Sequence, residues 1–126
     1  MQPSKSIFRL LPLALLVAGL LSIFSGCNSS SAVLVGTARA PIAPQLVKIY
    51  YQAPSNFEVV AIIDATGKSG WTDQGKMDGA VTALREKAAA LGANGVLVEK
   101  VFDQMNTYQG NSGTEKKIHG KAIFVN

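Results

Sequence analysis

An apolar stretch from Leu10 to Phe24 precedes the only cysteine of the chain, Cys27. Lys5 and Arg9 come before this stretch, and the small residues Ser25-Gly26 follow it. A basic start, an apolar middle and a small-residue end are typical of a secretory signal. The stretch of 15 residues is shorter than the roughly 20 residues that a helix needs to cross a bilayer. We therefore expect the leader to be removed, which leaves about 100 residues for a single domain.

Charge and cysteine content exclude several classes of protein. A single cysteine cannot form an intramolecular disulfide or a Cys-rich zinc site, so the core must hold the domain together. The whole chain has a formal charge of +4, and without Lys5 and Arg9 the remainder carries ten basic and eight acidic residues. This weak basic excess predicts no nucleic-acid partner. The pair Lys116-Lys117 is interpreted as solvated loop charge, and neither a cofactor nor a metal ion is expected.

Four apolar segments after the leader predict β-strands. In QLVKIYYQ, the residues Val47, Ile49 and Tyr51 share one face, so the segment predicts a strand buried on one side. Phe57 to Ala65 is apolar on both faces and predicts a central strand. The segments VLVEKVF and HGKAIFVN predict a final hairpin. Between them, DQMNTYQGNSGTEKK is interpreted as a polar connection that forms a long, mobile tip.

Residues from Gln74 to Leu91 predict one amphipathic helix, because apolar positions recur there at steps of three and four. Asp73 is the expected N-cap, and Gly92 is expected to end the helix in a left-handed conformation. The element order is then strand, strand, helix, strand, strand. This ββαββ order predicts the α+β class, with two layers: one helix packed on a small sheet of three to four strands.

The four residues FSGC, Phe24 to Cys27, resemble the lipobox of bacterial lipoproteins, although Phe24 stands where leucine is usual. The resemblance implies cleavage between Gly26 and Cys27, with diacylglycerol on the cysteine sulfur and a further acyl chain on the new amino group. Each buried methylene contributes about 0.8 kcal/mol, so three chains anchor a protein stably. Asn28, which is not aspartate, resembles an outer-membrane sorting signal. The alternatives are an uncleaved signal anchor, or ordinary cleavage that leaves a free thiol.

This interpretation divides the chain into three parts. Residues 1–26 are the expected signal peptide, residues 27–44 the lipidated cysteine with a tether and an extended arm, and residues 45–126 the α+β domain. The small polar run Asn28 to Ser31 predicts a flexible tether. Ala32 to Val35 is expected to be either a short edge strand or part of an arm laid on the domain.

From Ala32 onward the chain resembles a family of small, uncharacterised bacterial lipoproteins. The resemblance rests on the segments VLVGTAR, PQLVKIY, FEVVAIIDA, TDQGKMD and LREKAAALGANGVLVEKV. The element AAALGANGVLV is also distantly similar to the Rcs-type envelope-stress lipoprotein and to small proteins with a βαβ core. That element is a packing motif, so it implies a fold and no function. The stress lipoproteins rely on disulfides, which a single cysteine cannot supply, so none of their residues is carried over.

Three residues are weak candidates for a binding site. Asp64 ends an apolar strand next to a glycine-rich loop, Trp71 lies in that loop, and His119 is the only histidine. Each has a structural alternative. Asp64 can accept hydrogen bonds from loop amides, Trp71 can close the end of the core, and His119, beside Gly120, can be an exposed residue near the hairpin. The loop is not a phosphate loop, because Ile62 stands where a Walker A motif needs glycine.

The sequence contains no assembled set of acid, base, nucleophile or metal ligand. We therefore expect a lipid-anchored, non-enzymatic protein of the cell envelope. Its lipid would lie in the outer membrane, its domain would face the periplasm, and it would bind or sense another envelope component. Two alternatives stay open. One is an enzyme that acts on an envelope component through Asp64, Trp71 and His119, and the other is a structural subunit with an apolar patch on its uncovered sheet face.

Overall fold

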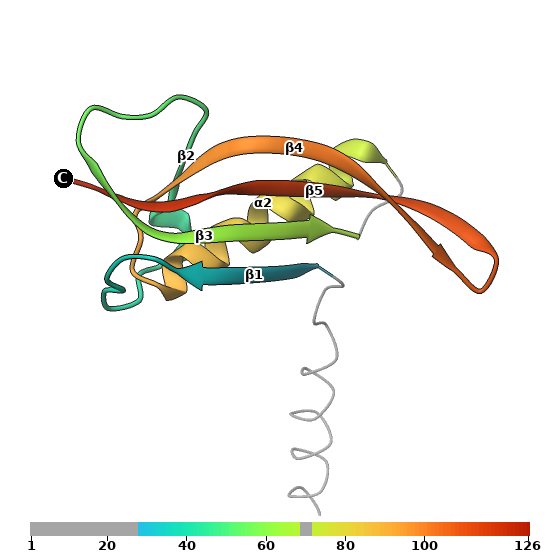
Figure 1. Ribbon diagram of the computed structural model, residues 1–126, viewed down its shortest axis with the longest axis horizontal. Coiled ribbons are helices and arrows are strands. Elements are labelled where there is room, and N and C mark those ends of the chain that lie inside the picture. Colours follow the sequence, from blue (N-terminus) through green and yellow to red (C-terminus); the bar gives the residue numbers. More distant parts are fainter. Residues whose placement is uncertain (1–27, 69–71) are drawn as a thin grey trace, which may run out of the picture.

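The computed structural model describes residues 28–68 and 72–126. Within them, one long helix packs on a five-stranded sheet whose strand order is β1-β3-β5-β4-β2 (Figure 1). β2 runs parallel to β4, and every other neighbouring pair is antiparallel. The elements are β1 (Ser29–Leu34), the 3-10 turn η2 (Pro44–Leu46), β2 (Lys48–Tyr50), β3 (Phe57–Gly67), α2 (Asp73–Ala90), β4 (Gly95–Tyr108) and β5 (Asn111–Val125).

The predicted α+β class, with one helix on a sheet, is confirmed, whereas the predicted strand count and ββαββ order are wrong. The additional strand is β1, which includes Ser29 to Ser31 of the predicted tether. These serines pair with Asp64 to Thr66. Since β3 would otherwise present an open row of backbone groups, pairing with β1 satisfies that edge despite the low β-propensity of serine.

The core lies between α2 and the sheet. Small side chains from α2 allow the helix to lie close to β3, and a Cβ added to Gly67 would overlap the carbonyl oxygen of Lys76. The helix was predicted from Gln74 to Leu91 and spans Asp73–Ala90. Its N-cap is Thr72 rather than Asp73, because the Thr72 hydroxyl accepts a hydrogen bond from the Gly75 amide at 3.1 Å. The buried helix residues are Ala80, Ala83, Leu84, Ala88 and Ala89.

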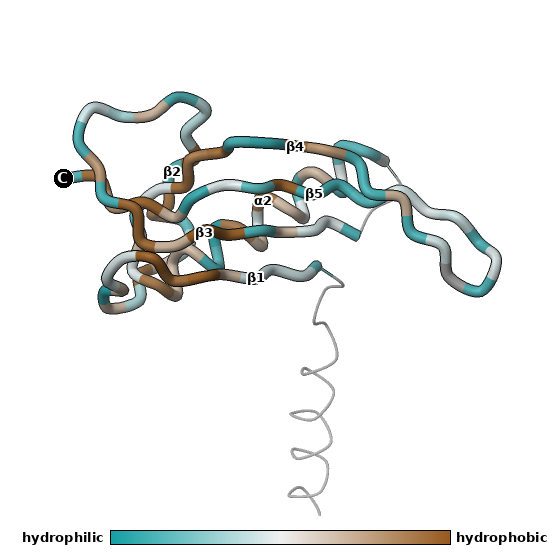
Figure 2. Tube along the Cα trace, viewed as in Figure 1, coloured by the Kyte–Doolittle hydropathy of each residue, from teal (hydrophilic) through white to brown (hydrophobic). Residues whose placement is uncertain are grey.

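Of the two alternatives for Ala32 to Val35, the edge strand is confirmed, because Ala32 to Leu34 lie in β1. The segment that follows, between β1 and β2, is laid on the end of α2. The backbone amides of Arg39 and Ile42 donate to the carbonyls of Leu91 and Ala89. The predicted strand through Gln45 to Gln52 is reduced to β2, because η2 occupies its first residues. Tyr51, expected on the buried face, is 74% exposed. Figure 2 shows that apolar residues concentrate at the end of the sheet near the C-terminus.

The predicted final hairpin is confirmed, but β4 and β5 continue as paired strands through the segment that was interpreted as a polar connection, so that interpretation is wrong. The hairpin closes at Tyr108 and Asn111, and the two residues between them, Gln109 and Gly110, have φ angles of 49° and 80°. Positive φ at both positions is what a two-residue type I′ turn needs. The end of this hairpin extends beyond the other strands as a two-stranded ribbon (Figure 1).

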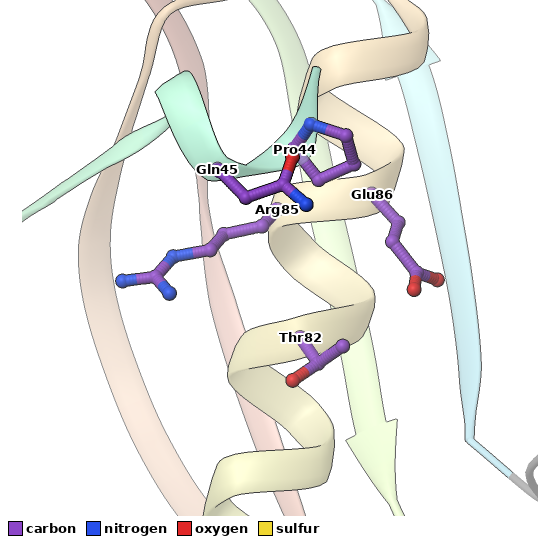
Figure 3. Close-up of a pocket in the computed structure, with 5 residues that line it drawn as sticks. All are labelled: Pro44, Gln45, Thr82, Arg85 and Glu86. Atoms are coloured by element: carbon purple, nitrogen blue, oxygen red, sulfur yellow. The ribbon is translucent and has the colours of Figure 1, made fainter.

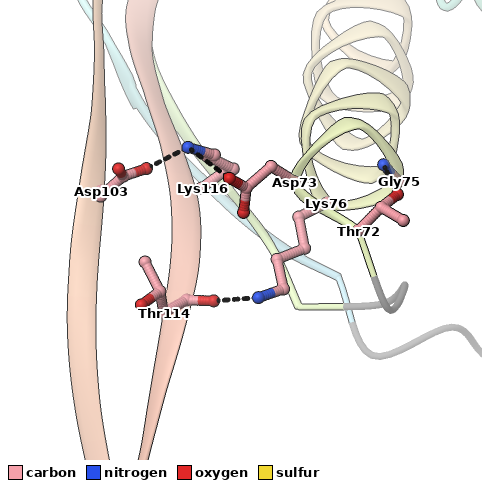
Figure 4. Close-up of polar contacts among 7 residues, drawn as sticks. All are labelled: Thr72, Asp73, Gly75, Lys76, Asp103, Thr114 and Lys116. Carbon is pink, nitrogen blue, oxygen red and sulfur yellow. Dashed lines mark hydrogen bonds and ion pairs between the residues drawn. The ribbon is translucent and has the colours of Figure 1, made fainter.

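Lys116, interpreted as solvated loop charge, instead lies in β5 and connects three elements. Its Nζ lies 2.5 Å from Asp103 Oδ1 on β4 and 3.8 Å from Asp73 Oδ2 at the start of α2. Close by, Lys76 Nζ donates to the carbonyl oxygen of Thr114 at 2.6 Å. Figure 4 shows these contacts joining the base of the hairpin to the first turn of α2.

Candidate functional site

The face of the sheet opposite α2 carries two of the predicted site residues. Asp64 on β3 stands directly opposite His119 on β5. Their neighbours Ile63, Ala65 and Ile118 are at most 1% exposed and pack in the core beneath α2. Because side chains alternate along a strand, Asp64 and His119 point to the uncovered face.

Four charged or polar side chains form a connected row across this face, which we call the polar row: Asp64, Glu99, His119 and Lys121. Nδ1 of His119 lies 2.8 Å from Oδ1 of Asp64, and Nε2 lies 3.6 Å from Oε2 of Glu99. The other oxygen of Glu99 contacts Nζ of Lys121 at 2.7 Å. The side chains are between 34% and 37% exposed, so a ligand can reach all four.

An irregularity in β4 brings Glu99 into the row. The register between β4 and β5 shifts between Val98 and Lys100, so Glu99 is the additional residue of a β-bulge. A bulge redirects the side chain of the additional residue and is common near binding sites. Here it places a second carboxylate beside His119. Both imidazole nitrogens therefore face a carboxylate, which favours recognition of a ligand through a fixed arrangement of charges.

A shallow cavity of about 260 Å³ adjoins the polar row on the β1 side. Its lining combines hydroxyl groups with one carboxylate and one ammonium group. The Nζ of Lys117 lies 5.8 Å from the ring centre of Phe102. This lining suits a polar ligand that both donates and accepts hydrogen bonds. The lining residues are Ser29, Ser30, Ser31, Asp64, Thr66 and Lys117.

A second cavity, of about 230 Å³, lies on the helix side between η2 and α2. Pro44, Gln45, Thr82, Arg85 and Glu86 line it. Figure 3 shows the charged ends of Arg85 and Glu86 pointing away from each other on opposite sides of the helix. Because the two charges do not converge, this cavity is a weaker candidate than the polar row.

The structure makes two sequence-based interpretations more specific. Asp64 was expected to accept loop amides, and the structure shows its carboxylate in contact with His119. His119 was expected to be an exposed residue near the hairpin, and it lies within β5 of that hairpin, paired on both sides and 37% exposed. Trp71 lies outside the described residues, as do the predicted cleavage and lipid-attachment residues Gly26 and Cys27. Glu99, Lys121 and the serines of β1 were missed, because only strand register brings them together.

The positions of Ser31, Asp64 and His119 can be compared with those of a Ser-His-acid catalytic site. A Ser-His-acid site needs the imidazole between the hydroxyl and the carboxylate. Here Ser31 stands opposite Asp64, while His119 pairs with Asp64 from the other side. The serine is thus two strands from the imidazole, roughly 10 Å away at a strand spacing of about 4.8 Å. Across residues 28–68 and 72–126, no three His, Cys, Asp or Glu side chains are grouped so that they could hold a metal ion.

Comparison with known proteins supports the fold. No protein-family model and no curated protein matches the sequence. Among solved structures, the chain is similar to the crystal structure of the Francisella virulence factor FvfA in its orthorhombic form. The superposition has a TM-score of 0.55 at 17% sequence identity and covers 75% of this chain and 96% of that one. At this identity the likeness supports a shared fold and indicates no ligand.

Proposed function

We propose that this chain is a lipid-anchored protein of the cell envelope that binds another envelope component through the uncovered face of its sheet. The observation that carries the binding role is the polar row. His119 is held between Asp64 at 2.8 Å and Glu99 at 3.6 Å, and the row remains accessible beside a hydroxyl-lined cavity. Charged groups already held in place by their neighbours lose little conformational freedom when a ligand binds.

The anchoring part of the proposal rests on the leader and its cysteine. In the described part of the chain, no helix is both long and apolar enough to cross a bilayer. A lipid on Cys27 would supply the membrane attachment, and the resemblance to outer-membrane lipoproteins supports a domain that faces the periplasm. Only Asn28 separates Cys27 from the first residue of β1. At about 3.5 Å per residue, the start of β1 would then lie within roughly 7 Å of the lipid-bearing residue.

A Cys27→Ser variant tests the anchor. We expect the unmodified chain to sediment with membranes and to carry a mature mass with three acyl chains, since a lipid bound through sulfur cannot form on serine. The variant should leave the membrane fraction. Met105→Ser is the matched control, because Met105 is 77% exposed on the distant hairpin. Equal sedimentation of the Cys27→Ser variant, or a mature mass without acyl groups, would contradict the anchor.

Crosslinking in intact cells followed by mass spectrometry tests the binding face. Replacing Asp64 with Asn removes one of the carboxylates of the polar row, so an adduct formed through this face should be lost. Asp78→Asn is the control, because Asp78 lies on α2 and bonds only to Gln74 in the described residues. An adduct that survives both substitutions would place the contact elsewhere on the molecule.

Catalysis on an envelope component is the second candidate, because the Asp64–His119 contact is how a carboxylate orients a catalytic imidazole. The two candidate functions differ in whether a reaction product is formed. Purified full-length protein incubated with isolated envelope fractions should release no new fragment if it only binds. A fragment that appears with the unmodified chain and disappears with His119→Gln would favour the enzyme.

A further inference from the structure

β1 is an edge strand that lacks the usual protection against pairing with another chain. Over Ser29 to Gly36 the sequence reads SSSAVLVG, with no charged residue and no proline. Val33, Leu34 and Val35 are 64%, 53% and 55% exposed. Natural sheets protect their edges with charges, prolines, bulges or very short strands, because an open edge is a template for another strand.

Two other strands with an open side have that protection, namely β2 and β4. β2 has only three residues. β4 has no neighbour beyond Leu97 on its β2 side in the described structure, but there it contains the bulge at Glu99 and the charged residues Lys100 and Asp103. By contrast, β1 pairs with β3 in one unbroken register over its whole length. Compared with β2 and β4, β1 therefore lacks this protection.

The backbone of β1 also presents the groups that a further strand needs. The Val35 amide donates to the Val60 carbonyl at 3.0 Å, toward β3. In an antiparallel ladder, every second residue bonds to a given neighbour. Val33 and Ser31 therefore bond to β3 as well, while the amides and carbonyls of Ala32 and Leu34 point to the open edge. Described residues provide no partner on that side.

We propose that the open edge of β1 pairs antiparallel with β1 of a second copy of this chain, which joins the two sheets into one. The edge is self-complementary. A two-fold axis at Val33 sets Val33 opposite Val33 of the second copy, and it sets Ala32 opposite Leu34, so apolar residues meet at the centre of the contact, with Ser31 opposite Val35 on each side. The same register pairs Ala32 and Leu34, the residues whose backbone groups point outward. Because the strand is uncharged, nothing repels its own copy, and a charged partner strand would find no counter-charge.

This pairing does not require the lipid, so a test of the dimer is independent of a test of the proposed anchor. An antiparallel two-fold contact is closed: it uses both β1 edges and leaves no further unprotected edge for continued growth. The contact therefore predicts a dimer rather than a fibre. It also leaves the polar row of each copy accessible, because that row lies on the face of the sheet and not at its edge.

A cysteine placed at the two-fold axis tests the contact in the full chain. In a Cys27→Ser background, Val33→Cys sets two thiols opposite each other in a non-hydrogen-bonded pair, where disulfides form readily. We expect mild oxidation in cells to give a disulfide-linked homodimer. Met105→Cys in the same background is the control, because Met105 is more exposed than Val33 but lies on the hairpin. Absence of the Val33→Cys dimer, equal dimers from both variants, or an adduct to a different protein would each overturn the proposal.

A second variant does not depend on disulfide chemistry. Leu34→Lys puts a charge at the exposed edge, and in the dimer it would bring like charges close together. Native mass spectrometry of the full chain in detergent should show dimers for the unmodified chain and monomers for Leu34→Lys, with unchanged far-ultraviolet circular dichroism. Dimers that persist in the folded Leu34→Lys variant would exclude β1 as the contact.

Discussion

Gly92 combines a left-handed backbone with a close contact, so an added methyl group there should be costly for two reasons. Its φ of +72° is left-handed, and a Cβ there would lie 2.6 Å from backbone atoms of Arg39. The left-handed conformation alone costs an L-residue about 1–2 kcal/mol, and the clash requires the segment on α2 to move. We predict that Gly92→Ala lowers the free energy of unfolding by more than about 2 kcal/mol in urea denaturation.

Two other glycines separate the conformational cost from the steric one. Gly110 has a φ of +80°, and an added Cβ would meet no atom within 4 Å, so Gly110→Ala should show the conformational cost alone. Gly113 has open space and no positive φ, so Gly113→Ala should leave stability almost unchanged. If Gly92→Ala is no worse than Gly110→Ala, the contact with Arg39 contributes nothing to stability.

Among the elements, the β4–β5 hairpin depends most on a few polar contacts, because its distal part packs on no other strand. Lys116 bridges Asp103 and Asp73 at the base of the hairpin (Figure 4). We predict that Lys116→Met speeds amide hydrogen exchange in residues 103–115 and leaves the rest of β5 unchanged. Lys117→Met is the matched control, since Lys117 lies on the opposite face and has no ion pair among the described residues. Equal acceleration by both variants would rule out the bridge as the cause.

The same bridge should depend on pH in one direction. The hydrogen bond to Asp103 is the main cause that raises the pKa of Lys116 above its ordinary value of 10.5, and both aspartates add charge attraction. A pKa raised in the folded state stabilises the fold fully below the unfolded pKa, and the contribution is lost as the pH rises through the folded pKa. The gap in thermal midpoint between the unmodified chain and Lys116→Met should therefore be constant from about pH 7 to 10 and narrow above that. A gap that widens in alkali would contradict this assignment.

These elements also show what the sequence could predict. β3, α2 and the left-handed Gly92 depend on local pattern, so apolar periodicity and one glycine were sufficient to predict them. Ser29 to Ser31 of β1 and the distal hairpin have the polar composition of loops, and pairing with another strand makes them extended. Asp64 and His119 were each identified, but their contact spans 55 residues of sequence and follows from strand register. Glu99 joins them only through a bulge, which has no sequence signal here.

At the scale of the whole molecule, stability should be greatest at the centre of the sheet and least at its edges. β3 and β5 have a strand on each side, and α2 covers one of their faces. Local opening is rarest where backbone groups are bonded on both sides and buried. We predict that Ile62 to Ala65 and Ile118 to Ala122 exchange amide hydrogens most slowly in the full chain, and that residues 104–114 exchange fastest.

β1 makes this exchange experiment informative about assembly as well as stability. In an isolated copy, the amides of Ala32 and Leu34 face the open edge and should exchange quickly, while those of Val33 and Val35 are protected by β3. In a β1-paired dimer, all four should be protected. Raising the protein concentration should therefore slow Ala32 and Leu34 selectively, and Leu34→Lys should abolish the effect at Ala32. Protection of Ala32 that is independent of concentration and of the substitution would mean that this edge is covered within a single chain.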